Sequence, residues 1–239
     1  MFSHSARLYD AIYSWKDYAA DADKVRALIA RHKQSLGKAL LDAACGTGEH
    51  LRYLKGDFDV EGLDLDPNML AVARGKHPDI PFHQGDMATF HLPRHFDVIL
   101  CLFSSTGYVR TPSALHRAIA NLGGHLQPGG VLLVEPWFAP EAFHPGTVHA
   151  LFIDQPELKV ARMNISRIEG GLSILDFHYL VGTPEEIEHF TERHELGLFR
   201  VEDYMAAFEA AGLETHHDPD GLTGRGLYLG LKPMAQPSA

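Results

Sequence analysis

Between about residues 17 and 130, short apolar runs alternate with amphipathic stretches, and this alternation limits the possible folds more than any other feature. The run at 96–103 is nearly continuous, as is typical of parallel strands that are buried on both faces. The stretches between the apolar runs carry apolar residues at helical spacing. Strands that alternate with helices are joined by right-handed crossovers and form a parallel sheet. The sequence therefore predicts an α/β fold with a doubly wound, mostly parallel, Rossmann-like sheet.

The expected elements can be placed along the chain. Helices are predicted over residues 17–35, 49–55, 112–126 and 201–211, and another begins at the Asp66-Pro67 pair. Strands are predicted over residues 39–42, 60–64, 80–84, 96–103, 131–135 and 225–231. A Gln-Pro-Gly-Gly sequence at 127–130 is expected to close the helix before the fifth strand.

The alternation stops after Glu135, which indicates an inserted segment. Residues 172–181 and 187–199 have the composition of an antiparallel strand pair. We predict that 139–199 is an antiparallel insertion, which caps the substrate site or forms a dimer contact. Residues 1–138 and 200–231 then form the core, and the polar, Pro-containing residues 232–239 form a disordered tail.

Composition excludes several classes of protein. The formal net charge is −10 and no Lys/Arg cluster is present, which argues against nucleic-acid and membrane-surface partners. No apolar run is long enough for a membrane span, and the first residues do not resemble a signal peptide. The two cysteines, Cys45 and Cys101, are expected to be reduced thiols of a cytoplasmic protein. The 16 histidines lack the spacing of zinc ligands, so no metal site is predicted.

A glycine-rich turn, Asp42-Ala-Ala-Cys-Gly-Thr-Gly48, directly follows the first predicted strand. Such a turn lets the backbone approach a ligand at the carboxyl end of a parallel sheet. The dinucleotide fingerprint needs a third glycine where this chain has Leu51, and the P-loop needs a Gly-Lys pair that is absent. Asp64 ends the second strand, where a carboxylate can bind a ribose diol, and Asp86 follows the third strand.

These three elements resemble the class I S-adenosylmethionine-dependent methyltransferases. The resemblance implies that Asp64 holds the ribose, that Asp86 holds the adenine amine, and that the glycine turn lies beside the methionine portion. The implied cofactor is S-adenosyl-L-methionine, which leaves as S-adenosyl-L-homocysteine. The implied cofactor-binding residues are Tyr18, Asp42, Ala44, Gly46, Gly48, Asp64, Leu65, Asp86, Met87 and Phe103.

A closer resemblance, from Leu8 to Leu231, is to the TDP-aminosugar N,N-dimethyltransferases of deoxysugar biosynthesis. It is carried by Leu8-Tyr-Asp10, Lys16-Asp-Tyr18, Phe103-Ser-Ser-Thr-Gly107, Val134-Glu-Pro-Trp137 and Thr223-Gly-Arg-Gly-Leu227. The resemblance implies that Phe2, Tyr9, Trp137, His178 and Arg225 bind the substrate. The chain departs from the family at Tyr108, where the family has His, and at Phe2, where the family has Tyr. Both positions border the substrate in that family.

Methyl transfer to an amine needs alignment more than acid–base chemistry, because the sulfonium is already a strong electrophile. The amine must be uncharged, but its proton can leave to solvent. We therefore predict that no general base is indispensable. If a side chain does take up the proton, Tyr108 and Glu135 are the candidates. The segment with Tyr9, Tyr13 and Tyr18 is expected to fold over the cofactor as a lid.

The sequence predicts an enzyme that methylates the amine of a nucleotide-linked aminosugar once or twice, with a homodimer compatible with the insertion. Arg225 is the expected phosphate-binding cation, together with Arg162, Arg167 and Arg193 of the insertion. The first alternative is a methyltransferase of another small acceptor, such as an amino acid, an amine or a hydroxyl-bearing natural product. More remote alternatives are a nicotinamide-dependent dehydrogenase and a non-catalytic protein that keeps the cofactor site.

Overall fold

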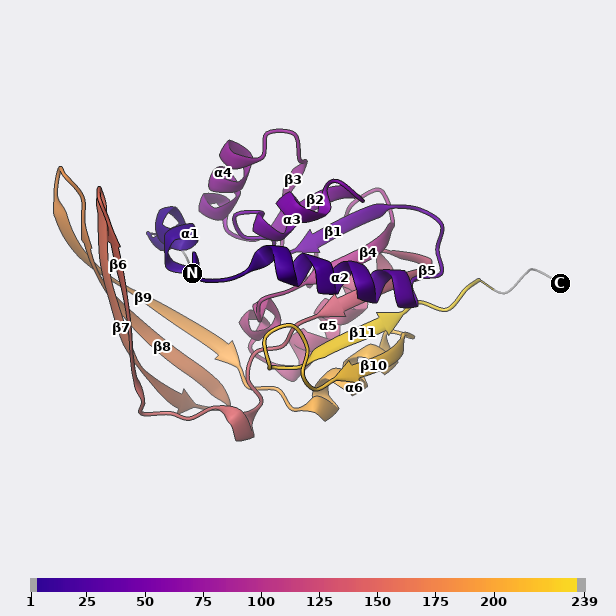
Figure 1. Ribbon diagram of the computed structural model, residues 1–239. Coiled ribbons are helices and arrows are strands. Elements are labelled where there is room, and N and C mark those ends of the chain that lie inside the picture. Colours follow the sequence, from indigo (N-terminus) through magenta and orange to yellow (C-terminus); the bar gives the residue numbers. More distant parts are fainter. Residues whose placement is uncertain (1–3, 236–239) are drawn as a thin grey trace.

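The computed structural model describes residues 4–235, which form one mixed sheet and one antiparallel sheet (Figure 1). The larger sheet consists of β1 (Ala39–Ala43), β2 (Asp59–Asp64), β3 (Phe82–Gln84), β4 (Phe96–Cys101), β5 (Leu126–Val134), β10 (Glu214–Asp218) and β11 (Leu227–Leu231). Its strand order is β10-β11-β5-β4-β1-β2-β3. Strands β1 to β5 are parallel, and β11 is antiparallel to both of its neighbours. The predicted mostly parallel sheet is confirmed.

Helices cover both faces of this sheet. The helical segments of residues 4–235 are η1 (Ser5–Leu8), α1 (Tyr9–Ile12), α2 (Tyr18–His32), α3 (Glu49–Leu54), α4 (Pro67–Lys76), η2 (Ser105–Val109), α5 (Pro112–Gly124), η3 (Pro140–Ala142) and α6 (Val201–Ala210). Apolar side chains of α2, α3 and α4 pack on one face of the sheet, and those of α5 and α6 pack on the other. Consecutive residues of β1, Leu40 and Leu41, belong to opposite faces, as the pleat requires.

Polar residues fix where the main helices begin. The carboxylates of Asp17 and Asp66 accept hydrogen bonds from the first-turn amides of α2 and α4. The hydroxyl of Thr111 accepts one from Ala114 at the start of α5. These bonds satisfy amides that have no partner inside the helix. Because the helix starts are fixed in this way, the loops at the carboxyl ends of the strands have defined positions.

The insertion forms the antiparallel sheet β6-β7-β8-β9 at the left of Figure 1. Its strands are β6 (Val148–Gln155), β7 (Leu158–Glu169), β8 (Leu172–Gly182) and β9 (Ile187–Gly197). The predicted pair corresponds to β8 and β9, whereas β6, β7 and β10 were not predicted. The two sheets are connected through a hydrophobic cluster that contains Leu175, Leu196, Leu198 and Phe143.

Several boundaries differ from the prediction. Strand β5 begins at Leu126, so the Pro-Gly-Gly sequence lies inside the strand, next to a register shift in its pairing with β4. Strand β4 ends at Cys101 instead of residue 103. Lys232 belongs to the fold, because its ammonium donates hydrogen bonds to the carbonyls of Gly123 and Leu126. Residues 236–239 of the predicted tail lie outside the described residues. No helix within 4–235 is long and apolar enough to cross a membrane.

Candidate functional site

A cavity of about 920 Å³ lies between the carboxyl ends of the parallel strands and the four-stranded sheet. The core contributes residues that follow β1, β2, β3, β4 and β5, and the insertion contributes residues of β6 to β9. Among the predicted site residues, the cavity is lined by Tyr9, Ala44, Gly46, Asp64, Leu65, Asp86, Met87, Phe103, Tyr108, Trp137 and Arg225. A smaller pocket beside it shares Gly46 and Phe103 and adds Tyr18 and Asp42.

The glycine turn after β1 needs backbone conformations that other residues rarely adopt. Gly46 and Gly48 have φ angles of 56° and 81°. The Gly46 amide donates a hydrogen bond to Asp64 Oδ2 at 2.8 Å, which ties the turn to the end of β2. Gly48 begins α3 and does not line the cavity, and a Cβ there would lie 3.1 Å from the His77 ring. Its role is to shape the turn, not to contact the ligand that the sequence predicted.

Two carboxylates lie at neighbouring strand ends on the wall of the cavity. Asp64 accepts backbone hydrogen bonds from Gly46 and Asp66, each at 2.8 Å, and burial raises its pKa. Asp86 accepts one from Ala88 at 2.8 Å. Each carboxylate oxygen can accept two hydrogen bonds, so both side chains keep acceptors for a ligand. The apolar side chains of Leu65 and Met87 lie on the same wall and fit the faces of a flat ring.

Asp42 is a buried acid at the smaller pocket. Burial and the nearby Asp64 raise its pKa to about 7, although His50 opposes the shift. Its Oδ2 is buried and has no hydrogen-bond partner among residues 4–235. A buried carboxylate oxygen without a partner is costly unless a ligand satisfies it. An ammonium group is the natural complement, so this pocket fits the amino-acid end of a ligand.

The N-terminal segment crosses the cavity and is fixed on both sides. On the core side, Asp10 accepts hydrogen bonds from Thr47 Oγ1 at 2.6 Å and Lys76 Nζ at 2.5 Å. On the insertion side, the Ser5 amide donates to Glu192 Oε1 at 3.1 Å. This arrangement places Tyr9 and Tyr13 in the cavity wall. Tyr18 reaches only the smaller pocket.

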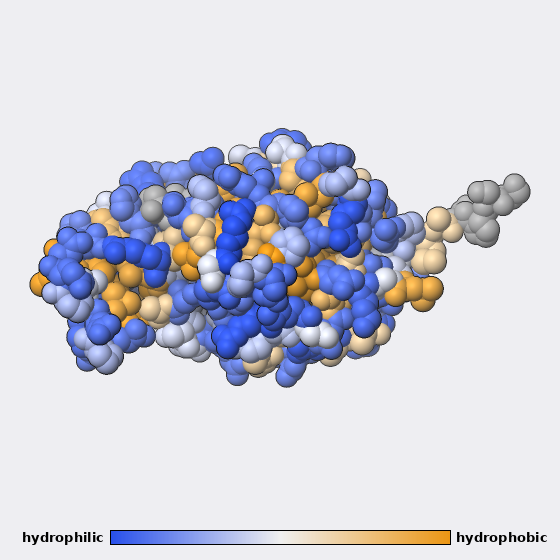
Figure 2. Space-filling model, turned by 90° about the horizontal axis from the view of Figure 1, so that it is seen from above, coloured by the Kyte–Doolittle hydropathy of each residue, from blue (hydrophilic) through white to orange (hydrophobic). Residues whose placement is uncertain are grey.

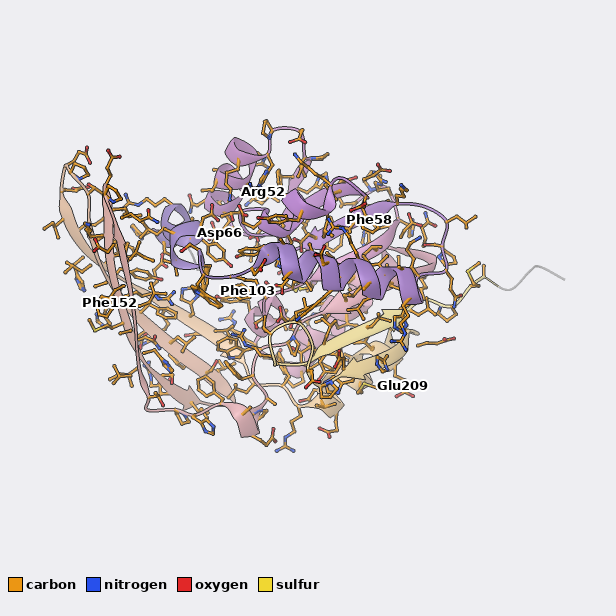
Figure 3. The ribbon with its side chains drawn as sticks, viewed as in Figure 1. Arg52, Phe58, Asp66, Phe103, Phe152 and Glu209 are labelled. Carbon is orange, nitrogen blue, oxygen red and sulfur yellow. The ribbon has the colours of Figure 1, made fainter. Side chains whose placement is uncertain are left out.

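The turn after β4 is held by Glu135, which is fully buried. Its carboxylate accepts hydrogen bonds from the Phe103 amide, at 2.7 Å, and from the Thr223 hydroxyl. Phe103 and Ser104 have positive φ angles of 53° and 68°, so the turn depends on such a support. Figure 3 shows Phe103 where the N-terminal helices meet the larger sheet. Glu135 does not line the cavity, which corrects its candidacy as a general base.

Arg225 reaches the cavity from the loop before β11. Its guanidinium lies over the rings of Trp137 and Phe138, 5.3 and 4.9 Å from their centroids, and donates to Ser104 Oγ at 2.7 Å. Within 4–235, no carboxylate lies within 4.0 Å of this guanidinium. Burial lowers its pKa, as expected for a cation that is partly removed from water.

The insertion contributes its own polar groups to the cavity. Arg162 of β7 lies over the ring of Phe177, 4.7 Å from its centroid. The Tyr108 hydroxyl lies 2.7 Å from Nδ1 of His194 on β9, and burial raises the pKa of Tyr108 well above 10. The sequence reasoning missed His194, because it is one of 16 histidines and nothing in the pattern pairs β9 with η2.

Other expected contacts are not formed. His178 is exposed on the outer face of the inserted sheet, where it stacks on His189 with a centroid distance of 5.9 Å. Side chains alternate along β8, so inward-facing Phe177 places His178 outward. Arg167 and Arg193 pair with Asp176 and do not line the cavity. Phe2 lies outside the described residues.

Comparisons with known proteins identify the family and the fold. Residues 40–130 match the sequence profile of a methyltransferase domain family. The dTDP-3-amino-3,6-dideoxy-alpha-D-glucopyranose N,N-dimethyltransferase of Streptomyces fradiae is 43% identical over 95% of this chain and 90% of its own length. The crystal structure of DesVI from Streptomyces venezuelae is 40% identical, with a TM-score of 0.89 over 96% of this chain and 98% of that chain.

A third similar protein has been solved with the cofactor. S-adenosylmethionine-bound CalS10, an amino pentose methyltransferase from Micromonospora echinaspora involved in calicheamicin biosynthesis, is 38% identical, with a TM-score of 0.84. The match covers 94% of this chain and 96% of the CalS10 chain. The predicted cofactor, S-adenosyl-L-methionine, is therefore confirmed, and the acidic pocket suits its ammonium and ribose. The chain belongs to the class I S-adenosylmethionine-dependent methyltransferases, in the family of the dTDP-aminosugar N,N-dimethyltransferases.

Proposed function

We propose that this enzyme transfers a methyl group from S-adenosyl-L-methionine to the amine of a nucleotide-linked aminosugar, once or twice. One observation carries the proposal: a single cavity joins acidic residues of the core to cations and aromatic rings at the insertion. Its volume of about 920 Å³ is near the upper end of ordinary small-molecule sites and has room for two ligands side by side.

The acidic half of the cavity, together with the smaller pocket that contains Asp42, suits the cofactor. We assign the ribose hydroxyls to Asp64, the adenine amine to Asp86 and the ammonium to Asp42, with Leu65 and Met87 beside the adenine ring. When bound, the cofactor supplies a methyl group on a positively charged sulfur. The work of the protein is then to hold the acceptor amine in line with that methyl group.

The opposite half suits a sugar nucleotide. The chain carries a net charge of −10, yet Arg162 and Arg225 both reach the cavity, and Arg110 and Arg117 also line it. Guanidinium groups bind phosphate oxygens through paired hydrogen bonds. The rings of Trp137 and Phe177 offer flat surfaces for a sugar or a base. A diphosphate with a sugar and a base matches this set better than a free amino acid or a simple amine.

The mass of the product tests the acceptor. The purified enzyme would be incubated with S-adenosyl-L-methionine and a panel of TDP-3-amino and TDP-4-amino sugars. The controls are the same aminosugars without the nucleotide and a TDP-sugar without an amine. We expect a gain of one or two methyl groups on at least one TDP-aminosugar and none on the controls. Methylation of the free aminosugar at an equal rate would show that the nucleotide is not recognised.

We also propose that the enzyme is a homodimer that pairs through the outer face of the inserted sheet. Phe152, Met163, Ile165 and Leu180 are each at least 45% exposed, although they are large apolar residues. Contiguous exposed apolar surface of this kind commonly marks a protein interface. Figure 2 shows apolar atoms at the end of the molecule that carries this sheet, and Figure 3 shows Phe152 on its outer side. A cytoplasmic location is proposed from the two free, buried thiols.

A further inference from the structure

We propose that Tyr108, His194 and Glu192 form a proton relay that removes the proton of the acceptor's ammonium group before methyl transfer. The inference rests on the proposed amine acceptor. It adds two residues of the insertion, His194 and Glu192, to the reaction centre. Of these, His194 lines the cavity, whereas Glu192 lies behind it.

The first link of the relay depends on a close approach between η2 and β9. A Cβ on Gly107 would lie 2.9 Å from Leu196 Cδ2 and 3.1 Å from Trp137 Cβ, so only glycine fits there. This approach brings the Tyr108 hydroxyl to 2.7 Å from His194 Nδ1. Since Tyr108 also lines the cavity, its hydroxyl can face a ligand on one side and the imidazole on the other.

The second link is between His194 and Glu192, which are on the same face of β9. His194 Nε2 lies 3.7 Å from Glu192 Oε2, and both side chains are almost fully buried. We assign the Nε2–H tautomer, because a proton there faces the carboxylate and leaves a lone pair on Nδ1 for Tyr108. An acid that orients an imidazole and stabilises its charged form is a recurring arrangement in catalysis.

Glu192 is held as an anion by the N-terminal segment. Its Oε1 accepts hydrogen bonds from the amides of His4 and Ser5, at 2.8 and 3.1 Å, and Oε2 accepts one from the Ser5 hydroxyl. Burial opposes ionisation, but the nearby His194 imidazole and the hydrogen bonds from Ser5 and His4 lower the pKa of Glu192 to about 2. The carboxylate is therefore charged at neutral pH and can stabilise an imidazolium.

Aromatic and charged side chains of neighbouring elements surround the relay. Phe177 of β8 packs against the His194 ring, edge to face at 5.2 Å. Among residues 4–235, the titratable or charged groups on adjacent elements that face Tyr108 and its neighbours include Tyr13, Asp64, Arg162, Tyr179 and His4. Tyr13, Tyr179 and Asp64 all raise the pKa of Tyr108, after burial, which has the largest effect. Tyr108 therefore stays neutral and can pass a proton on without remaining ionised.

The proton balance of the step is simple. The ammonium N–H of the acceptor donates its proton to Tyr108 Oη while the Tyr108 proton moves to His194 Nδ1. The products are a neutral amine, a neutral tyrosine and an imidazolium beside Glu192. The amine lone pair then forms the N–CH₃ bond as the S–CH₃ bond breaks and its electron pair returns to sulfur. A second methylation needs the same step, after His194 has lost its proton to solvent.

The relay is useful because most of the acceptor is protonated at neutral pH. An alkylammonium with a pKa near ~10 is neutral in only about one molecule in a thousand at pH 7. The relay allows the abundant ammonium form of the acceptor to react after it binds. At high pH, where the free amine is abundant, the relay is not needed. Its contribution must therefore shrink as the pH rises, which a merely structural contact would not do.

The test uses the full chain with the TDP-aminosugar that the wild type methylates. His194→Asn keeps an acceptor near the position of Nδ1 but cannot take up a proton, and Tyr108→Phe removes only the hydroxyl. We expect each variant to lose about 10² in kcat at pH 7, within the usual range for general base catalysis. The loss should fall below about tenfold near pH 9, and the affinity for S-adenosyl-L-homocysteine should not change. His216→Asn, an exposed histidine on β10, is the matched control.

The double variant and the pH profiles decide the outcome. The double variant Tyr108→Phe/His194→Asn should be no slower than the slower single variant, because both remove the same relay. A loss that is equal at all pH values, or smaller than about threefold at pH 7, would overturn the relay. If His194→Asn does not fold, the pH profile of Tyr108→Phe alone decides. A wild type that methylates no aminosugar would instead refute the proposed acceptor, so the two failures are distinguishable.

Discussion

At the scale of single residues, three acids of the cofactor site have the same chemistry but different surroundings. The positions of Asp64 and Asp86 could be predicted, because each lies at the end of a predicted strand or just after it, and parallel strands end at the same edge of a sheet. The raised pKa of Asp42 could not be predicted from the sequence, because it depends on burial and on His50 and Asp64, which the fold brings close. The mistaken assignments of Glu135 and His178 have the same origin, since sequence does not show which way a side chain points.

Asp42 makes cofactor binding depend on pH. Its pKa of about 7 means that the carboxyl is largely protonated in the free enzyme below neutral pH. An ammonium beside it favours the carboxylate, so binding lowers the pKa and releases a proton. The affinity for S-adenosyl-L-homocysteine should therefore rise by about tenfold between about pH 5.5 and pH 7. Isothermal titration calorimetry measures this, and equal affinities at the two pH values would refute the assignment.

A matched pair of variants separates Asp42 from general effects of pH. Asp42→Asn should bind S-adenosyl-L-homocysteine with nearly the same affinity at both pH values, because the titrating group is gone. Asp57→Asn removes an exposed acid that only pairs with Arg26, so it should keep the pH dependence of the wild type.

At the scale of elements, the core was predictable and the insertion was largely not. Strands β1 and β4 are almost entirely apolar and therefore stand out in the sequence. Strands β6 and β7 have apolar residues on both faces as well, Phe152 outward and Leu151 inward, but mixed with polar ones, so no clear period appears. Strand β10, Glu-Thr-His-His-Asp, is a polar edge strand with no apolar pattern. The close approach of η2 to β9 likewise has no sequence signal beyond Gly107.

Gly107→Ala should separate these two elements. The added Cβ would overlap Leu196 and Trp137, so η2 must shift or the core must strain, at a cost of about 1–3 kcal/mol in the free energy of unfolding. Gly56→Ala is the control, because a Cβ there meets no atom within 4 Å. Urea unfolding measures both, and equal stabilities of the two variants would show that the approach is not tight.

At the scale of the whole molecule, the enzyme is two sheets that face one cavity, with the N-terminal segment tied to both. The core carries the proposed cofactor site, and the insertion has two unlike faces. Its inner face completes the cavity, whereas its outer face exposes large apolar side chains. The chain has a net charge of −10, so the arginines that line the cavity concentrate positive charge in an otherwise acidic protein. This local positive charge favours an anionic acceptor.

The proposed dimer can be broken on that outer face. Phe152→Asp places a charge on a side chain that is 68% exposed in one chain but buried in the proposed interface. We expect sedimentation velocity to show a dimer for the wild type and a monomer for this variant. Leu36 is a fully exposed apolar residue outside the inserted sheet, so the Leu36→Asp variant should remain dimeric. A wild type that is monomeric at all concentrations would contradict the proposal.

We propose that one cavity holds the cofactor on the core and the aminosugar nucleotide at the insertion. A crystal structure with S-adenosyl-L-homocysteine and the TDP-aminosugar tests this most directly. We expect the ribose on Asp64, the phosphates on Arg162 or Arg225, and the acceptor nitrogen between the sulfur and the Tyr108 hydroxyl. A sugar nucleotide bound outside this cavity, or one whose amine is turned away from the sulfur, would contradict it.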